Sequence, residues 1–309
     1  MLERLKSLFH KPVINYSVSI KGLSVRYGTK TVLDNLSFTI GKRDIFGIIG
    51  LSGSGKSTLL KALLGFTHYN GLIKRGKSLG YCPQDEAFFN ELSLKENALL
   101  FGRMNSLDSG IALSRASKLL KELEVNESLD KMAGQLSGGQ QKRLNIILSI
   151  LHDPDLIVLD EPFAGLDYLN RSLLWDFIKR LRRKGKTIIL STHLLEEAQK
   201  HCNNLLIISH GKRFASGSIN DLKRSLKFRQ YISLRTKYLN KDNELKIKSY
   251  CAKKGLKVIE LSDKTMSFGL PDTESRKNLL SIIKHLGIKF VITEYRPPAL
   301  NELFMVSVK

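Results

Sequence analysis

The 309-residue chain is 42 % hydrophobic and 26 % charged, a composition typical of a globular protein with one or two domains. Its longest apolar runs, such as 144–151, are far shorter than the roughly 18–20 residues needed to cross a bilayer, so no membrane-spanning segment is predicted. The net charge of +21 favours an acidic partner, nucleic acid or anionic lipid without choosing among them. Cys82, Cys202 and Cys251 lack C-x-x-C spacing, which indicates neither a zinc site nor a disulfide framework and fits a reducing cytosol.

Residues 1–15 form an N-terminal arm before the first predicted strand. The arm has no apolar signal core, so secretion through a signal peptide is not expected. Leu2, Leu5, Leu8 and Phe9 fall near one helical face. The arm is therefore either frayed or a short helix that lies on a lipid surface.

Strand patterns follow, and they lead to a glycine-rich loop. Two strand-like segments within 18–40 predict an antiparallel opening sheet. The run 45–49 is almost wholly apolar, as in a central strand of a parallel sheet. The sequence GLSGSGKST occupies 50–58, and residues 57–64 have helical spacing. Strand, glycine loop and helix in this order predict a loop that binds phosphate groups.

Strands and helices alternate in the middle of the chain. Residues 92–134 have a helical pattern, which predicts a helical subdomain beside the sheet. The apolar strands 156–159 and 187–190 flank a helix over 171–183. This alternation predicts a parallel, doubly wound sheet with its ligand at the carboxyl ends of the strands. The basic stretch 179–186 suits the end of that helix, and a docking patch is the alternative.

The pattern changes near residue 223. From there the order is strand, helix, two strands, helix and strand, which predicts a small α/β domain over 224–309. This segment has no glycine loop, paired carboxylates or histidine cluster. We therefore expect it to regulate or dock rather than to catalyse.

The glycine loop supplies the chemistry for binding ATP. Glycines let backbone N–H groups approach phosphate oxygens, and the helix that follows adds the positive end of its dipole. Lys56 is a cation for the β- and γ-phosphates, and the Ser57 hydroxyl suits Mg²⁺. The predicted phosphate-binding residues are Gly50, Leu51, Ser52, Gly53, Ser54, Gly55, Lys56, Ser57 and Thr58.

Two adjacent carboxylates follow the strand 156–159. Asp160 is placed to bind the hydration shell of Mg²⁺, and Glu161 to orient and deprotonate an attacking water. Adjacent carboxylates can also simply end a strand at the surface. The nearby phosphate loop favours the catalytic interpretation.

The sequence LSGGQQKR at 136–143, which opens a helical pattern, resembles the signature motif of ATP-binding cassette (ABC) ATPases. The resemblance covers 16–223 and implies a P-loop NTPase fold with a parallel core sheet, an antiparallel β subdomain and a helical subdomain. In the family the signature faces the ATP of a second subunit. The residues implied here are Leu136, Ser137, Gly138, Gly139 and Gln140.

Other positions resemble further motifs of the family. Tyr27 resembles the aromatic residue that stacks on adenine, and Gln84 in YCPQ resembles the Q-loop glutamine. Asp167 in AGLD resembles the D-loop, and His193 in LSTH resembles the switch histidine. The interval from Lys56 to Gln84 is shorter than is usual in the family, which implies a shortened strand–turn region. The resemblance implies the catalytic set Glu161, His193 and Gln84, and the Mg²⁺ set Ser57, Gln84 and Asp160.

The chain lacks the coiled-coil, zinc and double-cassette features of the family's non-transport members, so one cassette is expected to pair with a copy of itself or a homologous subunit. Residues 91–104 and 295–309 resemble ATP-binding subunits of drug, polysaccharide and lipid exporters, whose permease is a separate chain. Phe88 and Phe89 are candidates for a permease groove or for local core packing.

The sequence thus predicts a cytoplasmic ATPase subunit, peripheral on the inner face of the cell membrane, that exports a substrate through a separate permease. No nucleic-acid partner is expected. The alternative is a soluble ABC ATPase that acts on nucleic acid or ribosomes, and only the +21 charge favours it.

Overall fold

The computed structural model describes residues 16–226, 228–302 and 305, so the predicted N-terminal arm lies outside the described residues. The chain divides into two compact units, of which the first ends at Ser216 and the second begins at Gly217. This division lies a few residues before the boundary expected after residue 223. Among the described residues, no helix is both long and apolar enough to cross a membrane. Cys82, Cys202 and Cys251 are all buried and unpaired.

The first unit contains two sheets. A three-stranded antiparallel sheet has the order β2-β1-β4, and a six-stranded sheet has the order β5-β6-β7-β3-β8-β9. Strand β3 pairs in parallel with both β7 and β8, and β6 pairs in parallel with β5 and β7. The strands are β1 (Tyr16–Tyr27), β2 (Lys30–Gly41), β3 (Ile45–Ile49), β4 (Asn70–Arg75), β5 (Leu79–Cys82), β6 (Leu156–Leu159), β7 (Thr187–Thr192), β8 (Asn204–Ser209) and β9 (Lys212–Ser218).

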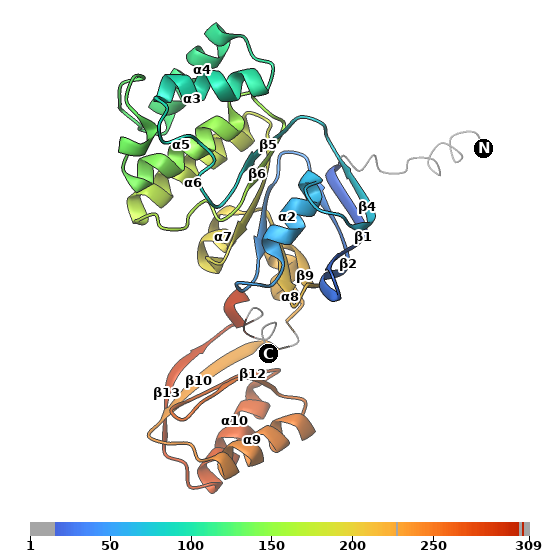
Figure 1. Cartoon of the computed structure of the whole chain (residues 1–309). Helices are drawn as coiled ribbons and strands as arrows, with labels where there is room; N and C mark the ends of the chain where they lie inside the picture. The colour runs from blue at the N-terminus through green and yellow to red at the C-terminus, as the bar shows by residue number, and fades with distance from the viewer. Residues whose placement is uncertain (1–15, 227, 303–304, 306–309) are drawn as a thin grey trace, which may run out of the picture. The chain divides into compact units, whose positions relative to one another are not determined.

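Two helices of the first unit begin at capping boxes. Ser93 and Glu96 form a capping box at the start of α3, and Ser137 and Gln140 form another at the start of α5. Helices α3, α4 and α5 contact one another and form the helical arm of this unit (Figure 1). The helical elements are α2 (Lys56–Leu64), α3 (Leu94–Met104), α4 (Ser109–Glu122), the 3₁₀ turn η1 (Ala133–Gln135), α5 (Gly138–Ile150), α6 (Tyr168–Arg183) and α7 (Leu195–His201).

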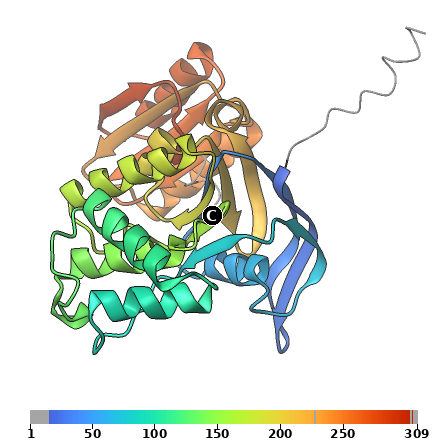
Figure 2. The same cartoon turned by 90° about the horizontal axis from the view of Figure 1, so that it is seen from above.

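The core of the first unit joins both sheets through α2. Buried leucines of α2, among them Leu59 and Leu63, belong to one hydrophobic cluster with Val18 of β1, Leu33 of β2 and Ile48 of β3. Figures 1 and 2 show α2 between the antiparallel strands on one side and the helical arm on the other. All five residues of β3 are buried, as expected for a central parallel strand. The parallel core sheet and the separate antiparallel sheet that the sequence predicts are both present.

The second unit has a core of its own. Its four-stranded sheet has the antiparallel order β11-β12-β10-β13, and its chain order is the βαββαβ arrangement. Side chains of the sheet pack against α9 and α10, with Ile232, Phe268, Ile247 and Leu279 fully buried. The elements are α8 (Ile219–Arg224), β10 (Gln230–Thr236), α9 (Lys241–Lys253), β11 (Lys257–Leu261), β12 (Thr265–Leu270), α10 (Thr273–His285) and β13 (Phe290–Arg296).

Candidate active site

The glycine loop follows β3 at the carboxyl edge of the core sheet. Gly53 and Gly55 have φ angles of 76° and 106°, in the left-handed region that favours glycine. A Cβ atom on Gly50 would lie 2.3 Å from the Ser54 hydroxyl oxygen and 2.7 Å from the Ile208 carbonyl oxygen. The loop therefore needs glycine at these positions both for its turns and for its close packing.

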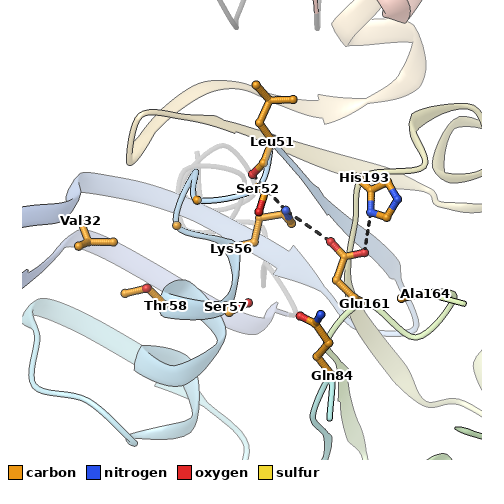
Figure 3. A pocket seen from close by; sticks show the side chains of 12 residues that line it. Val32, Leu51, Ser52, Lys56, Ser57, Thr58, Gln84, Glu161, Ala164 and His193 are labelled. Carbon is orange, nitrogen blue, oxygen red and sulfur yellow. Dashed lines mark hydrogen bonds and ion pairs between the residues drawn. The ribbon is translucent and has the colours of Figure 1, made fainter.

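A cavity of about 710 Å³ opens beside this loop and the first turn of α2 (Figure 3). Gln84, Glu161 and His193 approach it from the strands across the sheet. The glycine loop and these three side chains are thus brought together, although they lie up to 143 positions apart in sequence. The lining residues are Val32, Leu51, Ser52, Gly53, Gly55, Lys56, Ser57, Thr58, Gln84, Glu161, Ala164 and His193.

Lys56, the first residue of α2, places its ammonium group at the centre of the loop. Its Nζ donates hydrogen bonds to the carbonyl oxygens of Gly50 at 2.9 Å and Leu51 at 3.2 Å. The same atom lies 3.4 Å from Oε1 of Glu161. The two side chains are only 8 % and 11 % exposed, so water screens this ion pair weakly. The ammonium group can therefore act on a negatively charged ligand in the loop.

Glu161 is held between a cation and an imidazole. Its Oε2 lies 3.0 Å from Nδ1 of His193, and its Oε1 faces Lys56 (Figure 3). The residue has a φ angle of 47°, a left-handed conformation that costs a non-glycine residue on the order of 1–3 kcal/mol. The chain turns here immediately after β6, and this turn directs the carboxylate at the cavity.

Ser191 in β7, which is not among the predicted site residues, fixes the two carboxylate residues. Its fully buried hydroxyl donates to Oδ1 of Asp160 at 2.5 Å and accepts the backbone N–H of Glu161 at 2.8 Å. Asp160 also donates its backbone N–H to the carbonyl oxygen of Cys82. A hydroxyl residue directly after the apolar run 188–190, two positions before His193, was the available indication.

Two of the three residues predicted to supply oxygen ligands to Mg²⁺ line the cavity, and the third does not. Ser57 and Gln84 line the cavity, whereas Asp160 is 4 % exposed and is not among the lining residues. Hydroxyl, amide and carboxylate oxygens suit Mg²⁺, which usually keeps several waters and takes its remaining ligands from substrate phosphates. The donor chemistry therefore fits this ion, with Asp160 placed for an outer position.

The signature residues lie outside the cavity of their own chain. Ser137 is exposed and caps α5, where its hydroxyl oxygen accepts the backbone N–H of Gln140. Gly138 and Gly139 form the first turn of the same helix. Leu136, the residue before Ser137, is buried. None of Leu136 to Gln140 lines the cavity, so the described residues of one chain do not join the signature to the glycine loop.

Tyr27 and Asp167 lie at the ends of other elements. Tyr27 ends β1, is half exposed and is not a lining residue of the cavity. Asp167 caps α6: its carboxylate accepts hydrogen bonds from the backbone N–H and the side-chain amide of Asn170. These hydrogen bonds lower the pKa of Asp167 below its ordinary value.

Comparison with known proteins relates the first unit to one family. A family profile described as "ABC transporter" matches residues 33–164. An uncharacterized ABC transporter ATP-binding protein of Methanocaldococcus jannaschii is 33 % identical over 216 residues, or 70 % of this chain and 82 % of the relative. The Nod factor export ATP-binding protein I of Rhizobium sp. (strain N33) is 35 % identical over 215 residues, or 65 % of this chain and 71 % of the relative.

Solved structures that resemble this chain are also ATP-binding parts of ABC transporters. A chain described as the ATP-binding subunit of an ABC transporter has 29 % identity and a TM-score of 0.63, and the match covers 67 % of this chain and 92 % of that one. The ADP conformation of another ATP-binding cassette of an ABC transporter has 25 % identity and a TM-score of 0.59, with 66 % and 91 % covered.

Proposed function

Because the chain belongs to the ABC transporter family of ATP-binding proteins, we propose that it is an ATP-hydrolysing subunit that powers a separate membrane permease. The observation that carries this proposal is the contact of Glu161 with both Lys56 and His193 beside the glycine loop. A phosphate-binding loop alone serves many reactions. A buried carboxylate between a phosphate-binding cation and an imidazole suits hydrolysis of the phosphoanhydride bond of a bound nucleoside triphosphate.

The loop binds the phosphates of ATP through backbone N–H groups and the dipole of α2. Lys56 exchanges its contacts with carbonyl oxygens for contacts with the β- and γ-phosphates. Ser57, Gln84 and, through water, Asp160 would hold Mg²⁺, which supplies further positive charge to the phosphate oxygens. These residues position the γ-phosphate for attack by water.

Glu161 acts as the general base. It accepts a proton from the attacking water as the bond to the γ-phosphorus forms and the bond to the ADP oxygen breaks. His193 contacts the same carboxylate and orients it toward the γ-phosphate. Ser191 holds the backbone of Glu161 and the carboxylate of Asp160 in the matching geometry.

A second cassette completes each site. Ser137 and the first turn of α5 form an exposed helix N-terminus that suits an anion, yet they do not line the cavity of their own chain. We assign them to the ATP bound by a partner subunit, most simply a second copy of this chain. Tyr27 is then assigned to the adenine and Asp167 to the contact between subunits.

Export is the transport direction that the names of the relatives support, with the permease in the membrane and this chain on its cytoplasmic face. Several relatives at 34–35 % identity are named Nod factor export ATP-binding proteins. Their names do not identify the substrate of this chain. The second unit, which carries none of the predicted catalytic residues, is assigned a regulatory or docking role.

Steady-state ATP hydrolysis by the purified full-length chain tests the catalytic part of the proposal. We expect Mg²⁺-dependent release of phosphate that Glu161→Gln abolishes. Detergent co-purification tests the transport part: a polytopic membrane protein supports it, whereas RNA or DNA as the stoichiometric partner would support the soluble alternative. Hydrolysis that is equal in the wild type and in Glu161→Gln would contradict the catalytic assignment.

A further inference from the structure

The backbone of the Q-loop, residues 83–87 after β5, is held by side chains of α5. Asn145 donates from Nδ2 to the carbonyl oxygens of Pro83 at 3.3 Å and Asp85 at 3.0 Å. Its Oδ1 accepts the backbone N–H of Ala87 at 3.0 Å. Lys142 donates from Nζ to the carbonyl oxygen of Gln84 at 2.5 Å. Three consecutive carbonyl groups of the loop therefore accept hydrogen bonds from one helix.

Asn145 is buried in a part of α5 that is otherwise mainly apolar. It is 3 % exposed, and its neighbours in sequence, Leu144 and Ile146, are also buried. An amide in such a place is stable only when its polar groups are paired, and Asn145 uses both its donor and its acceptor atoms on the Q-loop. An apolar residue at this position would leave three backbone groups of the loop without these partners.

The Q-loop contacts bear directly on the cavity. Gln84 lies between the two residues whose carbonyl groups Asn145 holds, and its side chain lines the cavity with Lys56 and Glu161 (Figure 3). The direction of that side chain follows from the path of the backbone at 83–85. A small displacement of the loop would move the amide group of Gln84 relative to the ligand.

We propose that Asn145 is a positioning residue that aims Gln84 at the nucleotide and makes the Q-loop move together with α5. This inference rests on the proposed function in assigning the cavity to ATP. The same helix begins at the signature residue Ser137. In a two-chain site, the link therefore joins the glutamine that serves one ATP to the serine that serves the other.

Asn97 provides a matched control. It is fully buried in α3, and its Nδ2 donates to the carbonyl oxygens of Phe89, Leu92 and Ser93. Its Oδ1 accepts the backbone N–H of Phe89 at 2.9 Å. Asn97 thus makes the same kind of helix-to-loop contacts as Asn145, but on a segment that begins beyond the Q-loop and does not line the cavity.

The test compares Asn145→Ala with Asn97→Ala in the full-length chain. Both changes remove a buried amide, so both are expected to lower the melting temperature. For Asn145→Ala we expect kcat for ATP hydrolysis to fall roughly 10- to 100-fold. We expect the Kd for Mg²⁺-ATP to change less than about threefold, and kcat of Asn97→Ala to stay within about twofold of the wild type.

Amide hydrogen exchange gives a readout that does not require activity. The Ala87 amide should exchange faster in Asn145→Ala and unchanged in Asn97→Ala, because only the first variant removes its acceptor. Asn145→Asp keeps an acceptor for Ala87 but loses both donors to the Pro83 and Asp85 carbonyls. It should lose kcat like Asn145→Ala while it retains protection at Ala87.

Two kinetic results would overturn the inference: a wild-type kcat in folded Asn145→Ala, or an equal loss of kcat in Asn97→Ala. Unchanged exchange at Ala87 in Asn145→Ala would overturn it as well. Failure of the proposed function would give a different result: the wild type would hydrolyse ATP no faster than Glu161→Gln. In that case the Ala87 exchange still decides whether Asn145 holds the Q-loop.

Discussion

The hydroxyl of Ser191 in β7 accepts the backbone N–H of Glu161 at 2.8 Å. Glu161 follows the end of β6, the strand that pairs with β7. The same hydroxyl donates to Asp160, so one buried atom fixes both carboxylate residues. The contact also supports the left-handed backbone of Glu161. Its loss should affect catalysis more than nucleotide binding, because the glycine loop remains intact.

We therefore expect Ser191→Ala to lower kcat roughly tenfold or more with little change in ATP affinity. The buried N–H of Glu161 loses its partner, so the free energy of unfolding should fall by about 1–3 kcal/mol. Steady-state kinetics and denaturant unfolding measure the two effects. Ser149→Ala is the control, since the Ser149 hydroxyl donates only to a carbonyl oxygen of its own helix. Equal kinetic losses in both variants would refute a specific role for Ser191.

Glu161→Gln removes the proposed base but preserves the size of the side chain. Turnover should fall at least about 100-fold, the scale expected when a general base is lost. ATP should still bind, because Lys56 and the glycine loop are unchanged, and it should accumulate in an ATP-bound dimer. Single-turnover hydrolysis and size-exclusion chromatography with Mg²⁺-ATP measure these outcomes. A rate near that of the wild type would mean that another group activates the water.

The motifs were predictable because their chemistry is local in sequence. The glycine loop, Asp160 with Glu161, and the caps at Ser93 and Ser137 each depend on a few adjacent residues. Strand periodicity also predicted the βαββαβ order of the second unit. These features need no knowledge of distant contacts.

The supporting hydrogen bonds were not predictable in the same way. Ser191 contacts Glu161 because β6 and β7 are neighbours in the sheet, although 30 positions separate the two residues. Asn145 contacts the Q-loop over about twice that separation. The sequence shows Asn145 as a polar residue among apolar ones, and Ser191 as one of three hydroxyl residues around a short apolar run. The packing of strands and helices decides what each side chain contacts. The left-handed backbone of Glu161 has no sequence pattern at all.

The two compact units make a truncation informative. Each unit has its own hydrophobic cluster, and the cavity is lined only by residues of the first unit. A chain that ends after residue 223 keeps β9, the edge strand of the core sheet, which runs to Ser218.

We expect this truncated chain to bind ATP with an affinity close to that of the full-length protein. Fluorescence titration with a nucleotide analogue measures it, and circular dichroism shows whether the truncated chain is folded. Loss of binding by a folded truncation would assign the second unit a direct role in the site.

The last prediction concerns the two-chain site. Lys56→Ala should lose ATP binding, because the phosphates lose the cation at the centre of the loop. Ser137→Arg places a long cation at the exposed start of α5 and should block the surface that meets the partner's ATP. A homodimer of either variant has both sites damaged.

A mixed dimer distributes these lesions differently. One site combines Lys56→Ala with Ser137→Arg, whereas the other site pairs an unaltered Lys56 with an unaltered Ser137. Mixing the two proteins under conditions of subunit exchange should therefore restore one site per dimer that traps ATP. Nucleotide trapping after crosslinking measures this site, and differently tagged subunits show that mixed dimers have formed. If mixed dimers form but trap no more ATP than either variant alone, Lys56 and Ser137 do not serve the same nucleotide. Binding should recover more fully than turnover, because hydrolysis at one site can depend on an intact second site through the contacts that α5 makes with the Q-loop.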